Sequence, residues 1–283
     1  MKTRIITSVV GLLVLALVLC FFSTPVFNLV LAAVALIAIH EVYDAFGLKA
    51  PHVFAAFVPA AVLVMFSDRP VVHALLWPAL YVLAVYLCCC VIARVHTLDF
   101  AKVCGMAVFS GMILACFYSL LYLRQSFADP WESIYVILLI LGFAWGGDTS
   151  AYFAGRAFGR HKLAPVVSPH KTVEGAVGGV VGSVVIGLAI TGVYSAVYAQ
   201  PMLVQRYGAA AYLVLAVLGA AGSVLGILGD LTASAVKRQC GIKDYGTIFP
   251  GHGGIMDRFD SVMFIAPFVT VSLHIYAMFV QWP

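Results

Sequence analysis

Charged residues are scarce in this sequence. Lys, Arg, Asp and Glu make up 10% of the 283 residues, whereas hydrophobic residues make up 63% and the mean hydropathy is +1.06. A soluble globular domain has about 25% charged residues, so the composition excludes that class and indicates an integral membrane protein. The net charge of +4 is modest and no basic stripe alternates with aromatic residues, which argues against a nucleic-acid partner.

Closely spaced cysteine pairs are also missing. The seven cysteines form no C-x-x-C motif, so neither a zinc site nor a disulfide framework is predicted. Low-complexity linkers and repeats are absent too, and we expect a single membrane domain over residues 1–283. The apolar run 5–22 has no convincing small-residue cleavage site after it, and we interpret it as an uncleaved first membrane helix.

Long apolar runs are plentiful. A bilayer-spanning helix needs about 20 mainly apolar residues, and this rule predicts an all-α polytopic membrane protein with about nine transmembrane helices. The predicted helices cover residues 5–22, 26–39, 53–66, 71–92, 103–123, 133–147, 176–198, 210–228 and 261–280. The glycines from Gly175 to Gly187 are spaced for close packing of the seventh helix.

The basic residues predict the orientation. With a cytoplasmic N-terminus, thirteen of the sixteen Lys and Arg fall inside, and Arg69, Arg124 and Arg206 fall outside. This asymmetry places the two long polar segments, 148–175 and 229–260, on the cytoplasmic face. We assign Asp68, Asp129 and Glu132 to the solvent on the outer side.

The polar segment 229–260 concentrates charge of both signs between two apolar runs. Its acids are Asp230, Asp244, Asp257 and Asp260, and its bases are Lys237, Arg238, Lys243 and Arg258. Ionised groups beside hydrocarbon are costly, so the cluster needs an explanation. Either the segment is a solvated loop, or its acids hold a metal ion and its bases hold phosphate.

Residue spacing favours the second interpretation. If 229–239 is helical, Asp230, Ser234 and Lys237 share one face, and a helix starting near 255 places Asp257 and Asp260 on one face. Carboxylates aimed at a common point repel one another unless a cation lies between them, and carboxylate oxygens suit Mg²⁺. Glycines surround His252, for which we expect a phosphate or base-edge contact.

The segment 148–175 holds a second group of polar residues. Asp148 follows two glycines, and Ser168, Lys171 and Thr172 precede a glycine-rich helix whose N-terminus suits a polyphosphate. An N-cap followed by a snorkelling lysine is an equally good interpretation. The bases between Arg156 and Lys162 are expected to face anionic headgroups.

His40, Glu41 and Asp44 end the second predicted helix. A solvated helix end is the simpler interpretation, and a supporting role near the substrate is the alternative.

Together these residues predict a membrane enzyme that uses Mg²⁺ to join a nucleotide phosphate to a lipid at the cytoplasmic face. A CTP-dependent polyprenol or lipid kinase is one alternative, because it acts on the same kinds of substrate, although it transfers the terminal phosphoryl group to the lipid and releases CDP. A non-enzymatic transporter is a second, although its charges would lie in broken helices at mid-membrane. A CDP-alcohol phosphotransferase would need a DG-x-x-AR…G-x-x-x-D-x-x-x-D motif, which we do not find.

The second half of the chain resembles the phosphatidate cytidylyltransferases, also called CDP-diacylglycerol synthases. The resemblance lies in Ser234-x-x-Lys237-Arg238, Lys243-Asp244-x-Gly246, Pro250-Gly251-His252-Gly253-Gly254-Ile255-x-Asp257-Arg258-Phe259-Asp260, Gly147-Asp148-Thr149, Lys162-Leu163-Ala164-Pro165 and Ser168-Pro169-x-Lys171-Thr172. Residues 148–283 would then be the family-defining catalytic part, and residues 1–147 would be N-terminal transmembrane helices.

The resemblance implies that CTP and phosphatidate react to give CDP-diacylglycerol and diphosphate. It implies a homodimer in a bacterial inner membrane, with Mg²⁺ and a monovalent cation such as K⁺ in the site. By position, Asp230, Asp257 and Asp260 would hold metal; Asp230, Asp257, Lys237 and Arg258 would be catalytic; and Asp148, Ser168, Lys171, Thr172, Ser234, Arg238, Lys243, Asp244 and His252 would bind substrate. The family often has an acid where this chain has Ala233.

Overall fold

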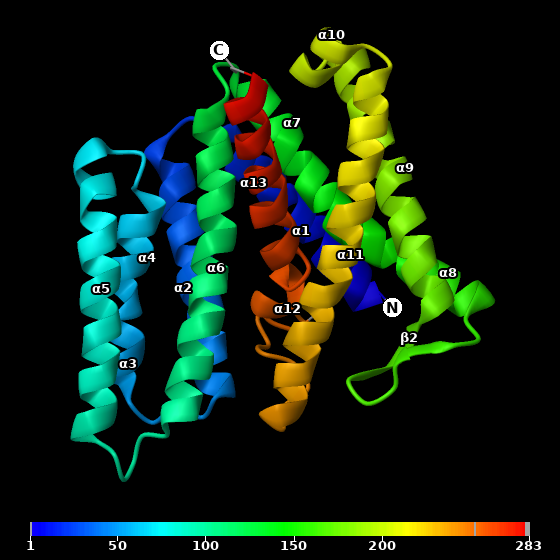
Figure 1. The fold of residues 1–283 in the computed structure, drawn as a ribbon. Helices are drawn as coiled ribbons and strands as arrows, with labels where there is room; N and C mark the ends of the chain where they lie inside the picture. The colour runs from blue at the N-terminus through cyan, green and yellow to red at the C-terminus, as the bar shows by residue number, and fades with distance from the viewer. Residues whose placement is uncertain (1, 252, 281–283) are drawn as a thin grey trace. The chain divides into compact units, whose positions relative to one another are not determined.

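The computed structural model describes residues 2–251 and 253–280, and helices dominate it (Figure 1). The elements are α1 (Lys2–Cys20), α2 (Pro25–Ala45), α3 (Pro51–Ala55), α4 (Phe57–Met65), α5 (Pro70–Ala93), α6 (Phe100–Ser126), α7 (Pro130–Leu141), the π-helix η1 (Gly142–Gly146), α8 (Gly147–Phe158), β1 (Lys162–Ala164), β2 (Ser168–Thr172), α9 (Val173–Val197), α10 (Met202–Tyr207), α11 (Ala210–Gln239), α12 (Met256–Phe259) and α13 (Val262–Val280). The predicted all-α class is confirmed, with one short antiparallel hairpin added.

Six helical stretches in the described part of the chain are long and apolar enough to cross a membrane. They are Pro25–Ala45, Pro70–Ala93, Phe100–Ser126, Pro130–Phe158, Val173–Val197 and Ala210–Gln239. Three shorter apolar helices, Val9–Cys20, Pro51–Met65 and Val262–Met278, correspond to the other predicted spans. The membrane class is therefore confirmed, and the count of nine spans stays a prediction.

Two of the predicted spans are longer in the structure because the helix continues into polar residues. The span predicted at 26–39 runs to Ala45, and the span predicted at 133–147 continues through η1 into α8. The span predicted at 53–66 is instead divided at Ala56 into α3 and α4. Pro59 explains this break, because it has no N–H to donate to the carbonyl of Ala55.

The chain forms two compact units. The first contains residues 1–125 and 237–259, and the second contains residues 126–236 and 260–283. Most of α11 belongs to the second unit, and its last turn belongs to the first. Each unit therefore holds a separate part of the polar segment 229–260.

In the first unit, α2 packs against α4 and α12, and α4 packs against α5. Its core includes the fully buried Ile39, Val42 and Met106. Asp68 was expected in solvent, but it lies 2.9 Å from Arg124, with its side chain only 19% exposed. The expectation was wrong because the guanidinium of Arg124, which also donates to Asn28, compensates the carboxylate.

In the second unit, α8 packs along α9, and small residues permit this contact. A Cβ added at Gly178 would collide with Ala154, and one at Gly182 would collide with Ser150. The predicted role of these glycines in close packing is confirmed. The same unit buries Glu132, which was expected in solvent.

Glu132 is 7% exposed and accepts hydrogen bonds from Tyr194 Oη at 3.2 Å and Met202 N at 2.9 Å. These two donors explain why this carboxylate is buried rather than solvated.

Candidate active site

The polar residues of the second unit meet where α9 begins. Lys171, in β2, forms an ion pair with Oδ2 of Asp230 in α11, and both side chains are partly exposed. Ser234 Oγ donates to Oδ1 of the same carboxylate at 3.2 Å, one turn further along α11. The helical spacing predicted for Asp230 and Ser234 is therefore confirmed. Lys171 therefore has an acidic partner within the second unit.

Thr172 is the N-cap of α9. Its Oγ1 accepts a hydrogen bond from Gly175 N at 3.1 Å, with the extended backbone typical of this position. Strands β1 and β2 pair antiparallel, with Lys162 opposite Thr172 and Ala164 opposite Ser168. The hairpin thus fixes Ser168 and Lys171 immediately before the helix N-terminus.

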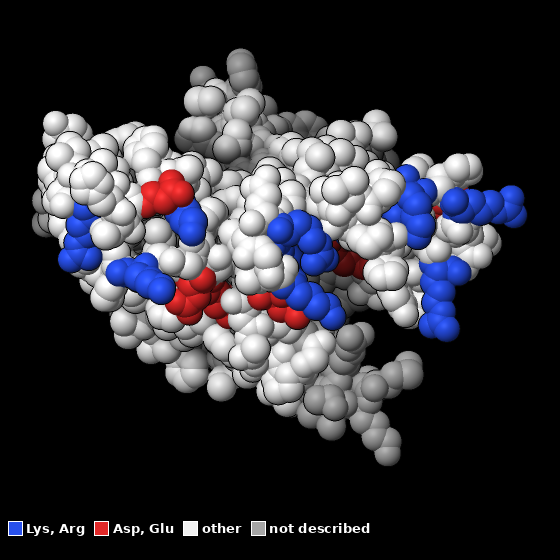
Figure 2. Space-filling model, turned by 90° about the horizontal axis from the view of Figure 1, so that it is seen from below, with Lys and Arg blue, Asp and Glu red and all other residues white. Residues whose placement is uncertain are grey.

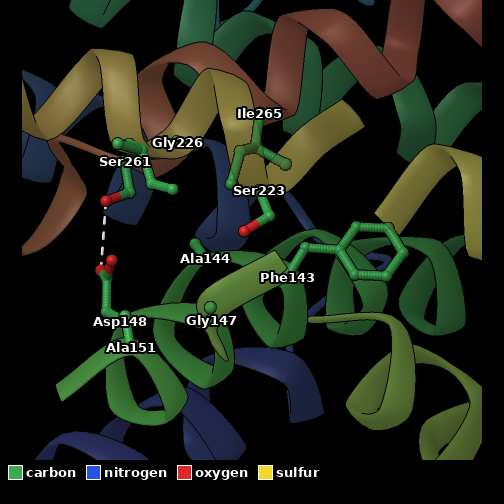
Figure 3. Close-up of a pocket in the computed structure, with 11 residues that line it drawn as sticks. Phe143, Ala144, Gly147, Asp148, Ala151, Ser223, Gly226, Ser261 and Ile265 are labelled. Atoms are coloured by element: carbon green, nitrogen blue, oxygen red, sulfur yellow. Dashed lines mark hydrogen bonds between the residues drawn. The ribbon is translucent and has the colours of Figure 1, made fainter. Parts of the chain in front are cut away.

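Asp148 lies in the first turn of α8, beside a small cavity (Figure 3). Ser261 Oγ donates to Asp148 Oδ2 at 3.1 Å, and Ser261 N donates to Oδ1 of the adjacent Asp260 at 2.8 Å. Ser223 also lines the cavity. Ser261, which directly precedes α13, therefore links the start of that helix to Asp148 in the first turn of α8. Its neighbour in sequence is Asp260, the predicted metal ligand.

The polar residues of the first unit form a buried ion pair. Lys237 Nζ lies 2.8 Å from Asp257 Oδ1, with the two side chains 11% and 4% exposed. Oδ2 of Asp257 accepts hydrogen bonds from Tyr245 N at 2.8 Å and Gly254 N at 3.0 Å. The ring of Tyr245 also lies 5.5 Å from the ammonium. Such saturation by donors is what a buried charge requires.

The glycine loop before α12 is tightly turned. Phe249 N donates to Gly253 O at 2.9 Å, and Gly251 and Gly253 have φ of 78° and 82°. Only glycine adopts this left-handed backbone without strain. A Cβ at Gly253 would also press on the Asp257 carboxylate. His252 lies outside the described residues.

Glu41 is a buried carboxylate for which the sequence left a solvated helix end and a supporting role as alternatives. It is 6% exposed, and its carboxylate accepts hydrogen bonds from Ile255 N at 3.0 Å and Met256 N at 2.8 Å. Its neighbours His40 and Asp44 pair with each other at 3.2 Å and are more than half exposed. The interpretation as a solvated helix end is therefore correct for His40 and Asp44, whereas Glu41 is buried and faces the glycine loop. The sequence feature that goes with this contact is the pair of loop glycines Gly246 and Gly254, which have no side chain to obstruct the Glu41 carboxylate.

The remaining predicted site residues of the first unit are exposed: Arg238, Lys243, Asp244 and Arg258. Figure 2 shows basic and acidic side chains close together over the left and centre of the molecular face, and mainly basic side chains at its right edge. Burial raises the pKa of the nearby Cys240 thiol.

The carboxylates differ in how well they fit a metal ion. Asp230 is partly exposed and has a hydroxyl beside it, which suits Mg²⁺ with its retained waters. Asp257 already accepts three donors, and one of its four lone-pair positions remains. Among the described residues, no group of three or more His, Cys, Asp or Glu is arranged to hold a metal ion. Metal ligation by Asp230, Asp257 and Asp260 stays a prediction.

The helical membrane fold and the lysine–aspartate pairs define a membrane protein with ion pairs in its polar segments. A family model described as the Cytidylyltransferase family matches residues 2–276. The chain belongs to this family, and the relationship inferred from the motifs is confirmed.

Three relatives illustrate the match, and each is named phosphatidate cytidylyltransferase. The chain is 31% identical to the protein of Staphylococcus haemolyticus over 279 residues, which cover 96% of this chain and 99% of that protein. It is 40% identical to the protein of Staphylococcus saprophyticus over 56% of this chain and 58% of that protein. It is 37% identical to the protein of Bacillus subtilis over 60% of this chain and 57% of that protein. The last two matches thus span somewhat over half of the relatives' lengths.

Proposed function

We propose that this protein is a phosphatidate cytidylyltransferase, which transfers CMP from CTP to phosphatidate. The observation that supports this most strongly is the alignment with the Staphylococcus haemolyticus enzyme along nearly the whole of both chains. The charge pairs Lys171–Asp230 and Lys237–Asp257 support it too, because they place acids and bases in the two motif-bearing polar segments.

The reaction joins two polyanions. A phosphate oxygen of phosphatidate attacks the α-phosphorus of CTP, the bond from that phosphorus to the bridging oxygen breaks, and diphosphate leaves. Since the phosphate oxygen is already anionic at neutral pH, no strong general base is needed. Lys171, Arg238, Lys243 and Arg258 would bind the phosphates and compensate their charge.

Asp230, with Asp257 and Asp260, would hold Mg²⁺, and a monovalent cation such as K⁺ would share the site. A bound Mg²⁺ would neutralise the triphosphate and the charge that develops on diphosphate. Lys237 would hold Asp257 in place through their 2.8 Å contact. Ser168, Thr172 and Ser234 would supply hydroxyls to the same phosphate region.

We further propose nine membrane spans with a cytoplasmic N-terminus, a catalytic face on the cytoplasmic side of a bacterial inner membrane, and a homodimer. The excess of Lys and Arg in the predicted inside segments supports this orientation. Phosphatidate would keep its acyl chains in the bilayer and present its headgroup at that face.

The test is incubation of the purified protein with radiolabelled CTP, phosphatidate and Mg²⁺, followed by separation of the products. We expect labelled CDP-diacylglycerol and diphosphate. Release of CDP with a phosphorylated lipid would instead identify a lipid kinase and overturn the proposal. EDTA is expected to stop turnover and added Mg²⁺ to restore it, whereas full turnover in EDTA would rule out the metal.

A further inference from the structure

Glu41 is a buried carboxylate that lies far in sequence from the motif it contacts. Ile255 N donates to Oε1 at 3.0 Å and Met256 N donates to Oε2 at 2.8 Å, across 214 and 215 residues of sequence. Both oxygens are therefore used, and each holds one main-chain N–H at the start of α12. The two bonds fix the orientation of the first turn that contains Asp257.

The glycines of the loop make room for this carboxylate. A Cβ at Gly246 would overlap Oε1, and a Cβ at Gly254 would overlap the whole carboxylate group of Glu41. The same Cβ at Gly246 would lie 3.0 Å from the Cα of Gly254. Neither glycine has a left-handed φ, so the backbone conformation does not explain why glycine is needed here. The close approach of the Glu41 carboxylate does explain it.

Three successive N–H groups of the loop are divided between two carboxylates. Gly254 N donates to Asp257, and the next two, from Ile255 and Met256, donate to Glu41. Asp257 also accepts from Tyr245 N, so the loop from 245 to 256 is held at its beginning and at its end. A carboxylate that only filled space here would be costly to bury, whereas one that orders N–H groups is compensated.

We propose that Glu41 is a positioning residue, whose carboxylate holds the loop 245–256 and the start of α12 so that Asp257 and Lys237 keep their catalytic arrangement. This inference rests on the proposed function for its kinetic consequence, but its structural consequence does not. Glu41 acts through the loop and contacts no substrate.

The test compares Glu41→Gln with Asp44→Asn in the full-length protein in detergent. Glutamine has the same shape, but its amide nitrogen donates and therefore faces another donor, whichever way the side chain turns. Asp44, one turn further along α2, is exposed and pairs with His40, so its variant controls for removal of a charge from the same helix.

The direct readout is hydrogen–deuterium exchange of the peptide that covers 245–256. We expect Glu41→Gln to increase exchange there, Asp44→Asn to leave it unchanged, and Glu41→Asp to give intermediate values. In the cytidylyl-transfer assay, we expect Glu41→Gln to lower kcat by about 10- to 100-fold, the factor that corresponds to losing a hydrogen bond to a charged acceptor. KM for CTP should change little, and Glu41→Asp should recover part of kcat.

Unchanged exchange and unchanged kcat in Glu41→Gln would overturn the proposal. Equal losses in Glu41→Gln and Glu41→Asp, with a lower unfolding temperature and uniform exchange along the chain, would show a general structural role and also overturn it. If the wild-type protein makes no CDP-diacylglycerol, the proposed function fails. The exchange difference between Glu41→Gln and Asp44→Asn still tests the role of Glu41.

Discussion

The ion pair between Lys237 and Asp257 allows a quantitative test, because both charges are buried and only 2.8 Å apart. Changing Asp257 to Asn leaves the ammonium without its partner, and changing Lys237 to Met leaves a carboxylate with only two main-chain donors. Removing one partner of a buried pair typically destabilises a protein by about 3–5 kcal/mol. We expect each single variant to fall in this range.

The double variant separates the pair energy from the rest. With both charges removed, neither site contains an uncompensated ion, so the loss should be smaller than the sum of the two single losses. We expect a coupling of about 2–3 kcal/mol, at the upper end for residues in contact. The same reasoning predicts that Asp257→Asn alone lowers activity partly by destabilising the protein, so its activity is measured together with the fraction of protein that is folded.

Thermal unfolding of the detergent-solubilised protein provides the assay. Cys90 and Cys116 are buried, so they react with a fluorescent maleimide only after unfolding, once the exposed and partly exposed cysteines have been blocked with an unlabelled reagent; these are Cys20, Cys88, Cys89, Cys104 and Cys240. Stability changes that add without coupling would refute the reasoning, because they would show that Lys237 and Asp257 do not depend on each other.

Two further variants test the phosphate site and the glycine loop. Lys171→Gln should lower the rate of CMP transfer by about 10²–10³, as expected for a lost electrostatic stabiliser. The control is Lys162→Gln, which should change the rate little, because Lys162 lies on the same hairpin but donates to a main-chain carbonyl. Equal effects of the two variants on the initial rate would contradict the role of Lys171. Gly254→Ala should disturb the loop and lower turnover, because its Cβ would overlap the Glu41 carboxylate. Gly111→Ala in α6 is the control, since no atom beyond its chain neighbours and its own helix backbone lies within 4 Å of the added Cβ. Wild-type turnover and a wild-type unfolding temperature in Gly254→Ala would contradict this expectation.

Most of the helices were predictable because their apolar runs are long. Their ends were less predictable, since a helix continues through polar residues wherever these find partners. The run predicted at 26–39 continues to Ala45 because Glu41 finds main-chain donors and His40 pairs with Asp44. The hairpin of β1 and β2 was not predicted, since two strands of three and five residues contain too little alternation to be recognised.

The site was predictable where contacts are local in sequence. Asp230 and Ser234 are one helical turn apart, and this spacing alone places their side chains together. The contact of Lys171 with Asp230 joins residues 59 apart, so no periodicity predicts it, and the motif resemblance only placed both residues in the same reaction. For Glu41 the sequence left a solvated helix end and a supporting role as alternatives, because a carboxylate at a helix end has the same local sequence whether it is solvated or buried.

Several charges of the site are compensated within their own unit before any substrate binds. Lys171 compensates Asp230, Lys237 compensates Asp257, and main-chain N–H groups surround Glu41. A protein beside hydrocarbon gains from this arrangement, since an isolated buried charge would be expensive. Under the proposed function, CTP and phosphatidate then bring negative charge that this balance does not neutralise. We propose that the exposed Arg238, Lys243 and Arg258 compensate part of it and that a divalent cation bound together with the nucleotide compensates the rest.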